Sequence, residues 1–479
     1  MQRRDVLFLL GVTAAALFVH GYHPRAEDAA IYLPGVEKIL DPQLFPFNAQ
    51  FFESHAHLTF FPNLIAISVR VTHLPLLYVL FLWHLVSIFL LLFACWELSR
   101  RVFKEKIACY AGVALVAALL TLPVAGTALY IMDQYANPRN LTAFAGILAV
   151  AKVLDRKYVT ALLLLFFGAA IHPLMAVFAI SFCVLLLCVE KFEPWPSVAC
   201  VLPLGLLDPP PVAYHDVALI HPYFYPLQWH WYEWLGVFGP IVILWWFGSI
   251  ARTRGLKNLE LLGRTLVLYQ TIFVIVALAI SAPARFESLV RLQPMRSLYL
   301  LYILFVLFSG GLLGQFVLKD RGWRWAALFL PLCAGMFYAQ RTLFPASAHI
   351  EWPGSAPRNP WAQAFEWVRQ NTPPEAVFAL DPNFMDIHGE DENGFRAIAE
   401  RSMLADDKTD SGATTMFPEM ADEWLRQVQA ERDWPQFQLR DFRRLHAEYR
   451  VDWVVLQQPG VAGLECLYQN TAVKICRVD

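Results

Sequence analysis

Residues 76–98 read LLYVLFLWHLVSIFLLLFACWEL, and this stretch decides the fold. A helix needs about 20 predominantly apolar residues to cross the hydrocarbon core of a bilayer. The stretch meets that requirement, so it predicts a transmembrane helix.

Ten further windows have a similar apolar character, although some are short or broken by proline. They lie near 5–21, 107–130, 139–154, 157–171, 173–189, 197–207, 234–250, 262–282, 296–317 and 324–343. The weakest is 197–207, which is too short alone and is followed by three prolines. Together the windows predict a mainly α fold, a polytopic bundle of about 11 transmembrane helices over residues 1–343.

The composition agrees with a membrane protein that also has a soluble part. Of the 479 residues, 57% are hydrophobic and 16% are charged, whereas a soluble domain has about 25% charged residues. The tail, residues 344–479, carries 22 acidic and 13 basic side chains, a net charge of −9. Residues 1–343 carry the remaining 18 acidic and 25 basic side chains, a net charge of +7. The near-neutral total argues against a nucleic-acid partner.

The positions of lysine and arginine predict which loops face the cytoplasm, because short cytoplasmic loops retain these residues. Basic residues recur in alternate loops, at 3–4, 100–106, 152–157, 252–257 and 319–324. The apolar run after Arg4 also suits a signal peptide, but no Ala-x-Ala site follows it, so we expect an uncleaved first span. About 11 crossings from a cytoplasmic N-terminus place the tail outside. We expect a multi-pass protein of a bacterial inner membrane with a periplasmic or extracellular C-terminal domain.

Residues 22–75 form a long first outer loop. Its apolar residues between 28 and 40 have the spacing of one helical face, and they are Ile31, Leu33, Val36, Ile39 and Leu40. This pattern predicts an amphipathic helix that lies in the membrane interface. Residues 58–71 predict a second interfacial helix or a re-entrant segment.

The tail, residues 344–479, has the pattern of a compact extracytoplasmic α/β domain. Helices are predicted over 361–370, 420–429 and 439–449, strands over 376–380 and 453–456, and a hairpin from 465–468 and 472–478. The polar residues 386–410 predict a long loop. Cys466 and Cys476 flank the hairpin turn, so they form either a cross-strand disulfide outside the cytoplasm or two reduced strand residues.

Ionisable side chains cluster at the predicted outer face, where they are costly to keep and therefore candidates for function. An outer carboxylate such as Glu27 or Asp28 can accept a proton from an acceptor hydroxyl as a general base. An arginine can hold a lipid phosphate by two hydrogen bonds, and the candidates for this role are Arg139, Arg291 and Arg296, with His172 beside them. Structural alternatives stay open: a charge pair at a helix start, head-group anchors and a turn histidine.

Residues 214–234 concentrate tyrosine and tryptophan, as interfacial belts do. His215, Asp216, His221 and His230 lie in the same stretch, but their spacing matches no metal-ligand pattern. We therefore predict no cofactor and no metal site from these residues, and a divalent metal bound elsewhere stays open as the alternative.

Asp28-Ala29-Ala30-Ile31-Tyr32 keeps the Asp and the Tyr of an Asp-Glu-x-x-Tyr motif, with Ala29 in place of the glutamate. In this respect, and in its many spans and outer C-terminal domain, the chain resembles the GT-C superfamily of integral-membrane glycosyltransferases. The stretches around Arg139, His172 and residues 291–296 look like bacterial multi-pass proteins placed near that superfamily. The chain lacks the Trp-Trp-Asp-Tyr-Gly sequence of oligosaccharyltransferases.

The resemblance implies an inverting transfer of a sugar from a polyprenyl-phosphate carrier to an acceptor glycan, lipid or protein at the outer face. It assigns the catalytic base to Asp28, supported by Glu27, and places Tyr32 among the substrate-binding residues. The alternative is a non-catalytic scaffold or a lipid-glycan transporter of envelope assembly. No internal repeat is found, and transporters usually have one.

Overall fold

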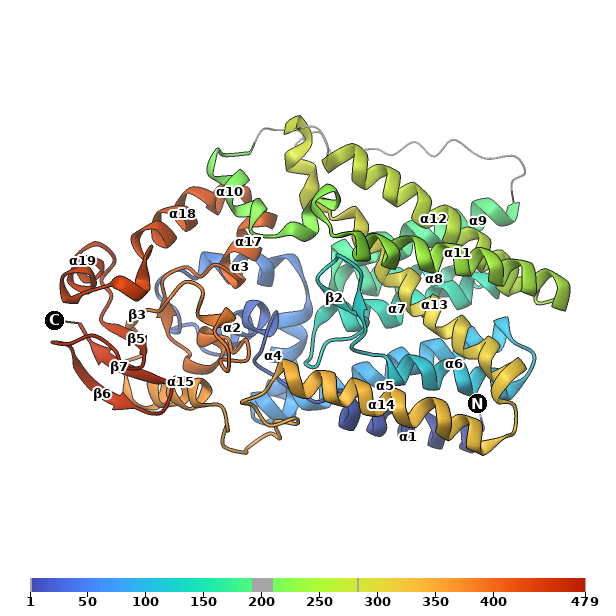
Figure 1. Ribbon diagram of the computed structural model, residues 1–479, viewed down its shortest axis with the longest axis horizontal. Helices are drawn as coiled ribbons and strands as arrows, with labels where there is room; N and C mark the ends of the chain where they lie inside the picture. Colours follow the sequence, from blue (N-terminus) through green and yellow to red (C-terminus); the bar gives the residue numbers. More distant parts are fainter. Residues whose placement is uncertain (1, 192–209, 282–283, 479) are drawn as a thin grey trace. The chain divides into compact units, whose positions relative to one another are not determined.

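The computed structural model describes residues 2–191, 210–281 and 284–478 (Figure 1). The chain forms two compact units that interleave along the sequence. Unit 1 comprises Met1–Gly21, Leu82–Pro209 and Pro222–Ala339, and unit 2 comprises Tyr22–Phe81, Pro210–His221 and Gln340–Asp479. The first outer loop therefore belongs to the same unit as the C-terminal tail.

Unit 1 is built from helices. They are α1 (Arg3–His20), most of α5 (Leu76–Val102), α6 (Lys106–Ala118), α7 (Pro138–Leu154), α8 (Tyr158–Ile171), α9 (Pro173–Lys191), α11 (Trp231–Arg254), α12 (Lys257–Ser281), α13 (Leu298–Leu313) and most of α14 (Gly322–Leu343). Shorter elements connect them: strands β1 (Pro123–Val124) and β2 (Leu129–Tyr130), and helical turns η2 (Pro222–Phe224), η3 (Pro226–Gln228), η4 (Ala284–Leu292), η5 (Pro294–Ser297) and η6 (Gly314–Leu318).

Five helical stretches among the described residues are long and apolar enough to cross a membrane: Leu76–Val102, Pro173–Glu190, Trp231–Arg254, Lys257–Ser281 and Phe286–Leu318. Each overlaps a window that the sequence predicts. The predicted count of about 11 spans is not confirmed, and the window 197–207 lies outside the described residues.

Small residues allow helices α6 and α13 to pack closely in the core of unit 1. A Cβ atom on Gly310 would lie 2.7 Å from the carbonyl oxygen of Ala111 and 2.8 Å from the Cα atom of Gly112. Only glycine fits such a backbone approach, which is typical of helix pairs in membranes.

Unit 2 has a five-stranded sheet in the order β4-β3-β5-β7-β6, formed by β3 (Val377–Ala379), β4 (Ser402–Met403), β5 (Trp453–Gln457), β6 (Glu465–Gln469) and β7 (Val473–Arg477). β3 is parallel to β4 and β5, whereas β7 is antiparallel to β5 and β6. Successive residues of a strand point to opposite faces. Phe378 therefore packs in one core with α15 (Pro360–Asn371), and Val377 packs in the other with α19 (Leu439–Tyr449).

The first outer loop forms helices α2 (Ala29–Leu40), α3 (Gln50–Leu58) and α4 (Phe61–Thr72). Helical structure over the two predicted stretches is thus confirmed, while their interfacial position stays a prediction. α2 packs against α3, α4 and α16 within unit 2, and eight of its twelve residues are buried. Protein contacts, rather than a lipid surface, cover most of this helix.

The predicted loop over residues 386–410 is wrong. It contains the end of η7 (Phe384–Asp386), then α16 (Phe395–Ala399), β4 and the start of α17 (Thr409–Met416). The remaining elements of unit 2 are α10 (Ala213–Leu219), η8 (Pro418–Met420), α18 (Ala421–Ala430) and η9 (Trp434–Gln436). Buried polar contacts order the segment, and its apolar pattern does not reveal them.

The predicted hairpin is confirmed, with Cys466 and Cys476 opposite each other on β6 and β7. The two residues form a disulfide. Disulfides persist in oxidising compartments outside the cytoplasm.

Candidate functional site

Glu27 and Asp28 stand directly before α2, and a second segment of unit 2 holds their backbone. Glu27 has a φ of 52°, a left-handed conformation that is uncommon for residues with a side chain. Its N–H donates to the carbonyl oxygen of Glu392 at 2.9 Å. Asp28 is the N-cap of α2, is half-buried and makes no capping hydrogen bond with its carboxylate. That carboxylate therefore does not cap the start of the helix.

The facing segment, residues 390–394, lies alongside the acidic pair. Ala26 and Asn393 form an antiparallel bridge between the two stretches. Asp391 and Glu392 are also left-handed, with φ of 62° and 57°. Such conformations cost about 1–3 kcal/mol each and cluster at functional sites. This concentration of strained acidic residues marks the stretch as the candidate site.

Gly394 lies where the facing segment touches α2. Its N–H donates to the carbonyl oxygen of Arg25 at 2.9 Å. A Cβ atom at this position would lie 2.4 Å from the Cβ atom of Ala30, so any side chain would push the two stretches apart.

We expect Gly394→Ala to lower the stability of unit 2 by about 1–3 kcal/mol, the usual cost of overpacking. The measurement is the thermal midpoint of the purified full-length protein. Gly412→Ala is the matched control, because its Cβ atom would meet only Ile31, at 4.0 Å, and alanine favours a helix over glycine. Equal losses in the two variants would contradict the close approach at Gly394.

Lys408 brings a cation to the facing segment. Its Nζ atom lies 3.0 Å from the carboxylate of Glu392 and 3.2 Å from that of Asp386. Burial alone lowers the pKa of Lys408, but Glu392 and then Asp386 raise it, and the net direction is upward. The ammonium group of Lys408 therefore stays charged. It pairs with the carboxylate of Glu392, and the carbonyl oxygen of the same residue accepts the N–H of Glu27.

Buried polar contacts fix the start of α17, directly after Lys408. Arg396 donates to the two carboxylate oxygens of Asp410 at 2.7 and 2.8 Å, and both side chains are buried. Asp406 accepts the N–H of Lys408 at 2.9 Å. The indole N–H of Trp424 donates to the carbonyl oxygen of Asp406 at 2.9 Å. Lys408 thus projects from a rigid base.

Asp407 and Glu431 are two carboxyl groups of unit 2 whose pKa values are raised by burial and by neighbouring carboxyl groups. Burial raises the pKa of Asp407 to about 6, and repulsion from Asp406 and Asp381 adds to the effect. Burial also raises the pKa of Glu431 well above its usual range, and repulsion from Asp381 raises it further. Folding therefore favours the protonated states of Asp407 and Glu431.

We expect unit 2 to lose stability as the pH rises from about 4 to about 7. The folded pKa of Asp407 is raised, so its contribution is fully present below pH 3.8 and is lost as the pH rises through about 6. The difference corresponds to about 3 kcal/mol before screening, and the half-buried position reduces it to about 1 kcal/mol. Thermal midpoints across this range test the sign, and Asp407→Asn should flatten the curve. An unchanged slope in the variant would contradict this assignment.

Residues 210–221 contact α17 through two side chains. The hydroxyl group of Tyr214 donates to the carbonyl oxygen of Thr415 at 3.0 Å, and His221 Nε2 lies 2.9 Å from the hydroxyl oxygen of Ser411. Across the described ranges, no group of three or more His, Cys, Asp or Glu residues is arranged to hold a metal ion.

Arg139 and His172 of unit 1 have local partners. Arg139 donates to both carboxylate oxygens of Asp133 at 2.8 and 2.6 Å, and both residues are buried. A phosphate would have to replace this carboxylate. His172 lies between α8 and α9, and its Nδ1 atom accepts the N–H of Met175 at 3.5 Å.

Arg291 and Arg296 lie in η4 and η5, next to the aromatic stretch. The guanidinium group of Arg296 lies 5.4 Å from the ring centroid of Tyr223, a cation–π contact. Tyr225 donates its hydroxyl hydrogen to Glu287 at 2.9 Å. The Nε atom of Arg291 is buried and has no hydrogen-bond partner in the described part of the chain. The aromatic stretch thus helps to position the segment that carries both arginines.

The structure places Glu27, Asp28 and Tyr32 in unit 2, and it places Arg139, His172, Arg291 and Arg296 in unit 1. Tyr32 is buried, and its ring packs edge-on against Phe61 at 6.0 Å, so it is part of the loop's core. The sequence analysis did not identify Glu392 or Lys408 as site residues. The only feature of the sequence that pointed to them is the density of charged residues in 386–410.

The described residues thus define a helical protein with membrane-length helices and a small α/β sheet domain. Residues 359–430 match a family described as a domain of unknown function (DUF6798). No curated protein sequence matches the chain.

Solved structures of an archaeal oligosaccharyltransferase, AglB from Archaeoglobus fulgidus, are similar to the chain. One, in complex with an inhibitory peptide and a dolichol-phosphate, has 12% identity and a TM-score of 0.49 over 95% of this chain and 69% of that one. Another, in complex with Zn and sulfate, has 12% identity and a TM-score of 0.46 over 94% and 68%. Likeness at this level assigns neither an activity nor a substrate to the chain.

Proposed function

We propose that the protein is a GT-C-like glycosyltransferase that moves a sugar from a polyprenyl-phosphate carrier to an acceptor at the outer face of the membrane. One observation carries the proposal. The acidic pair of the first outer loop and the C-terminal α/β domain fold into one compact unit. A domain that positions an acceptor has to be joined to the base in this way, because proximity and orientation supply much of the catalysis.

Asp28 acts as the general base. The acceptor hydroxyl gives its proton to Asp28 while its oxygen attacks the anomeric carbon of the sugar. The bond from that carbon to the phosphate oxygen breaks, and the polyprenyl phosphate leaves with the electron pair, so the configuration is inverted. The left-handed Glu27, held by Glu392, fixes the backbone from which Asp28 projects.

Arg291 and Arg296 bind the phosphate of the carrier through charge-assisted hydrogen bonds, which stabilise its developing charge. Arg139 has a smaller part, since Asp133 occupies both arms of its guanidinium group. The proposed chemistry uses a lipid-linked sugar as donor and needs no resident cofactor.

The function is tested by incubating the purified full-length protein with a radiolabelled lipid-linked sugar in liposomes. The proposal requires label to move to a water-soluble or protein acceptor, with an equal amount of polyprenyl phosphate released. A folded protein that releases none from any donor of the native membrane is a scaffold.

We also expect the C-terminal domain to lie outside the cytoplasm, where the Cys466–Cys476 disulfide is stable. Alkaline phosphatase fused after Asp479 should be active, and the same reporter fused after Lys104 should be inactive. The reverse pattern would place the acidic pair on the wrong side of the membrane for this donor.

A further inference from the structure

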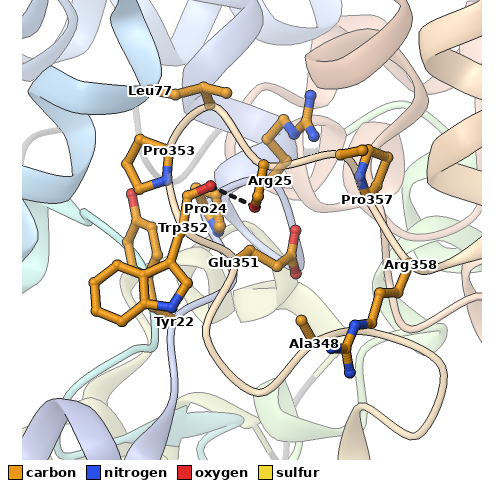
Figure 2. A pocket seen from close by; sticks show the side chains of 12 residues that line it. Tyr22, Pro24, Arg25, Leu77, Ala348, Glu351, Trp352, Pro353, Pro357 and Arg358 are labelled. Atoms are coloured by element: carbon orange, nitrogen blue, oxygen red, sulfur yellow. Dashed lines mark hydrogen bonds between the residues drawn. The ribbon is translucent and has the colours of Figure 1, made fainter.

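A pocket in unit 2 lies beside the first turn of α5 (Figure 2). It is lined by Tyr22 and Arg25 from the start of the outer loop, by Leu77 of α5, and by the segment that contains Glu351, Trp352 and Arg358. Its cavity volume is about 20 Å³ and it opens to solvent, so the enclosed part has room for about one water-sized group. A small polar group fits such a space.

The aromatic lining places the pocket at the depth of lipid head groups. Leu77 is the second residue of a candidate membrane span. The rings of Tyr22 and Trp352 pack against Phe81 of the same helix, with centroids 5.2 and 5.6 Å away, and Trp352 is 47% exposed. Tryptophan and tyrosine at the end of a span mark the membrane–water interface.

The charges of the pocket are balanced. Arg25 is buried and pairs with Glu366 at 3.1 Å, while its Nε atom has no partner in the described ranges. Arg358 is exposed and forms no ion pair within the part of the chain that is described. Glu351 contacts His23 through Oε1 at 2.9 Å, which leaves Oε2 for another group. One unused cation and one available carboxylate therefore face the same space.

We propose that this pocket binds the zwitterionic head group of a membrane phospholipid of the phosphoethanolamine class. Arg358 holds the phosphodiester, with Arg25 behind it. Glu351 accepts hydrogen bonds from the ammonium group, which also lies against the exposed face of Trp352 in cation–π contact. Figure 2 shows the Trp352 ring on one side of the pocket, Arg358 on the other and the carboxylate of Glu351 between them. This site is independent of the sugar transfer proposed above.

The test is binding of short-chain phosphatidylethanolamine, phosphatidylglycerol and inorganic phosphate to the full-length protein in detergent, measured by native mass spectrometry. We expect phosphatidylethanolamine to bind about tenfold more tightly than phosphatidylglycerol. Arg358→Ala should weaken both lipids about tenfold. Glu351→Gln should weaken phosphatidylethanolamine to a similar extent without weakening phosphatidylglycerol, so the preference disappears. Thermal midpoints check that each variant is folded.

Arg440→Ala is the matched control, since Arg440 is an exposed arginine of unit 2 that does not line the pocket. It should leave all binding unchanged. The inference is overturned if wild type prefers phosphatidylglycerol, or if the lipid preference persists in Glu351→Gln. Loss of binding in Arg440→Ala equal to that in Arg358→Ala would also overturn it. If inorganic phosphate binds more tightly than either lipid, the pocket recognises free phosphate and not a membrane lipid, and the inference is overturned.

Discussion

Asp28→Asn should slow sugar transfer by about 10²- to 10⁴-fold, the usual contribution of a general base. Asparagine keeps the shape of the side chain and one hydrogen-bonding oxygen, but it cannot accept the proton of the acceptor hydroxyl. Asp28 makes no capping hydrogen bond to α2, so we expect no loss of helix stability through a cap. The measurement is the initial rate of transfer from a labelled lipid-linked sugar at saturating donor.

Glu27→Gln is the matched control for the acidic pair. Its effect on the rate should be smaller than that of Asp28→Asn, because the contact that holds Glu27 uses the backbone N–H and the carbonyl oxygen of Glu392. A larger loss in Glu27→Gln would mean that the two acids have exchanged roles. Unchanged rates in both variants would remove this pair from the chemistry.

Arg396→Ala should destabilise unit 2 by about 3–5 kcal/mol, since it leaves the carboxylate of Asp410 buried without its partner. The two residues are buried and share two hydrogen bonds. The thermal midpoint of the full-length protein should fall strongly, and protease should cut first within residues 386–416. Replacing both partners, Arg396→Met with Asp410→Leu, should restore part of the stability, because no unpaired charge remains.

Arg369→Ala is the control for this ion pair. Arg369 pairs with Glu400 at 3.2 Å in the same unit, but both side chains are partly exposed. Exposed pairs contribute about 0–1 kcal/mol, so the midpoint should change little. Similar losses in Arg369→Ala and Arg396→Ala would show that burial is not the reason for the effect.

The sequence predicts those elements of unit 2 that have a clear apolar period. α19 begins and ends at the predicted residues, and α15 and the hairpin lie within a residue or two of their predicted bounds. α16, β4 and α17 were missed because polar partners stabilise them. Arg396 meets Asp410 only after the chain has folded, so a pattern of apolar residues gives no sign of these elements.

Only part of the candidate site could be predicted from the sequence. Glu27 and Asp28 stand out in the sequence because two acids follow an apolar helix. Their supporting residues do not, since Lys408 lies far along the chain and its two carboxylate partners lie within the segment predicted as a loop. The left-handed backbone at Glu27, Asp391 and Glu392 is likewise a property of the fold, because only a few per cent of residues other than glycine adopt it.

The most direct test of the account is donor consumption by wild type and Asp28→Asn, measured side by side. Both proteins are reconstituted with the total lipid extract of the cells that make them, and lipid-linked sugars are followed by mass spectrometry. The account predicts that wild type depletes one lipid-linked sugar and releases its polyprenyl phosphate, whereas the folded variant leaves that sugar essentially intact. Equal depletion by both proteins, or depletion by neither, would contradict catalysis by Asp28.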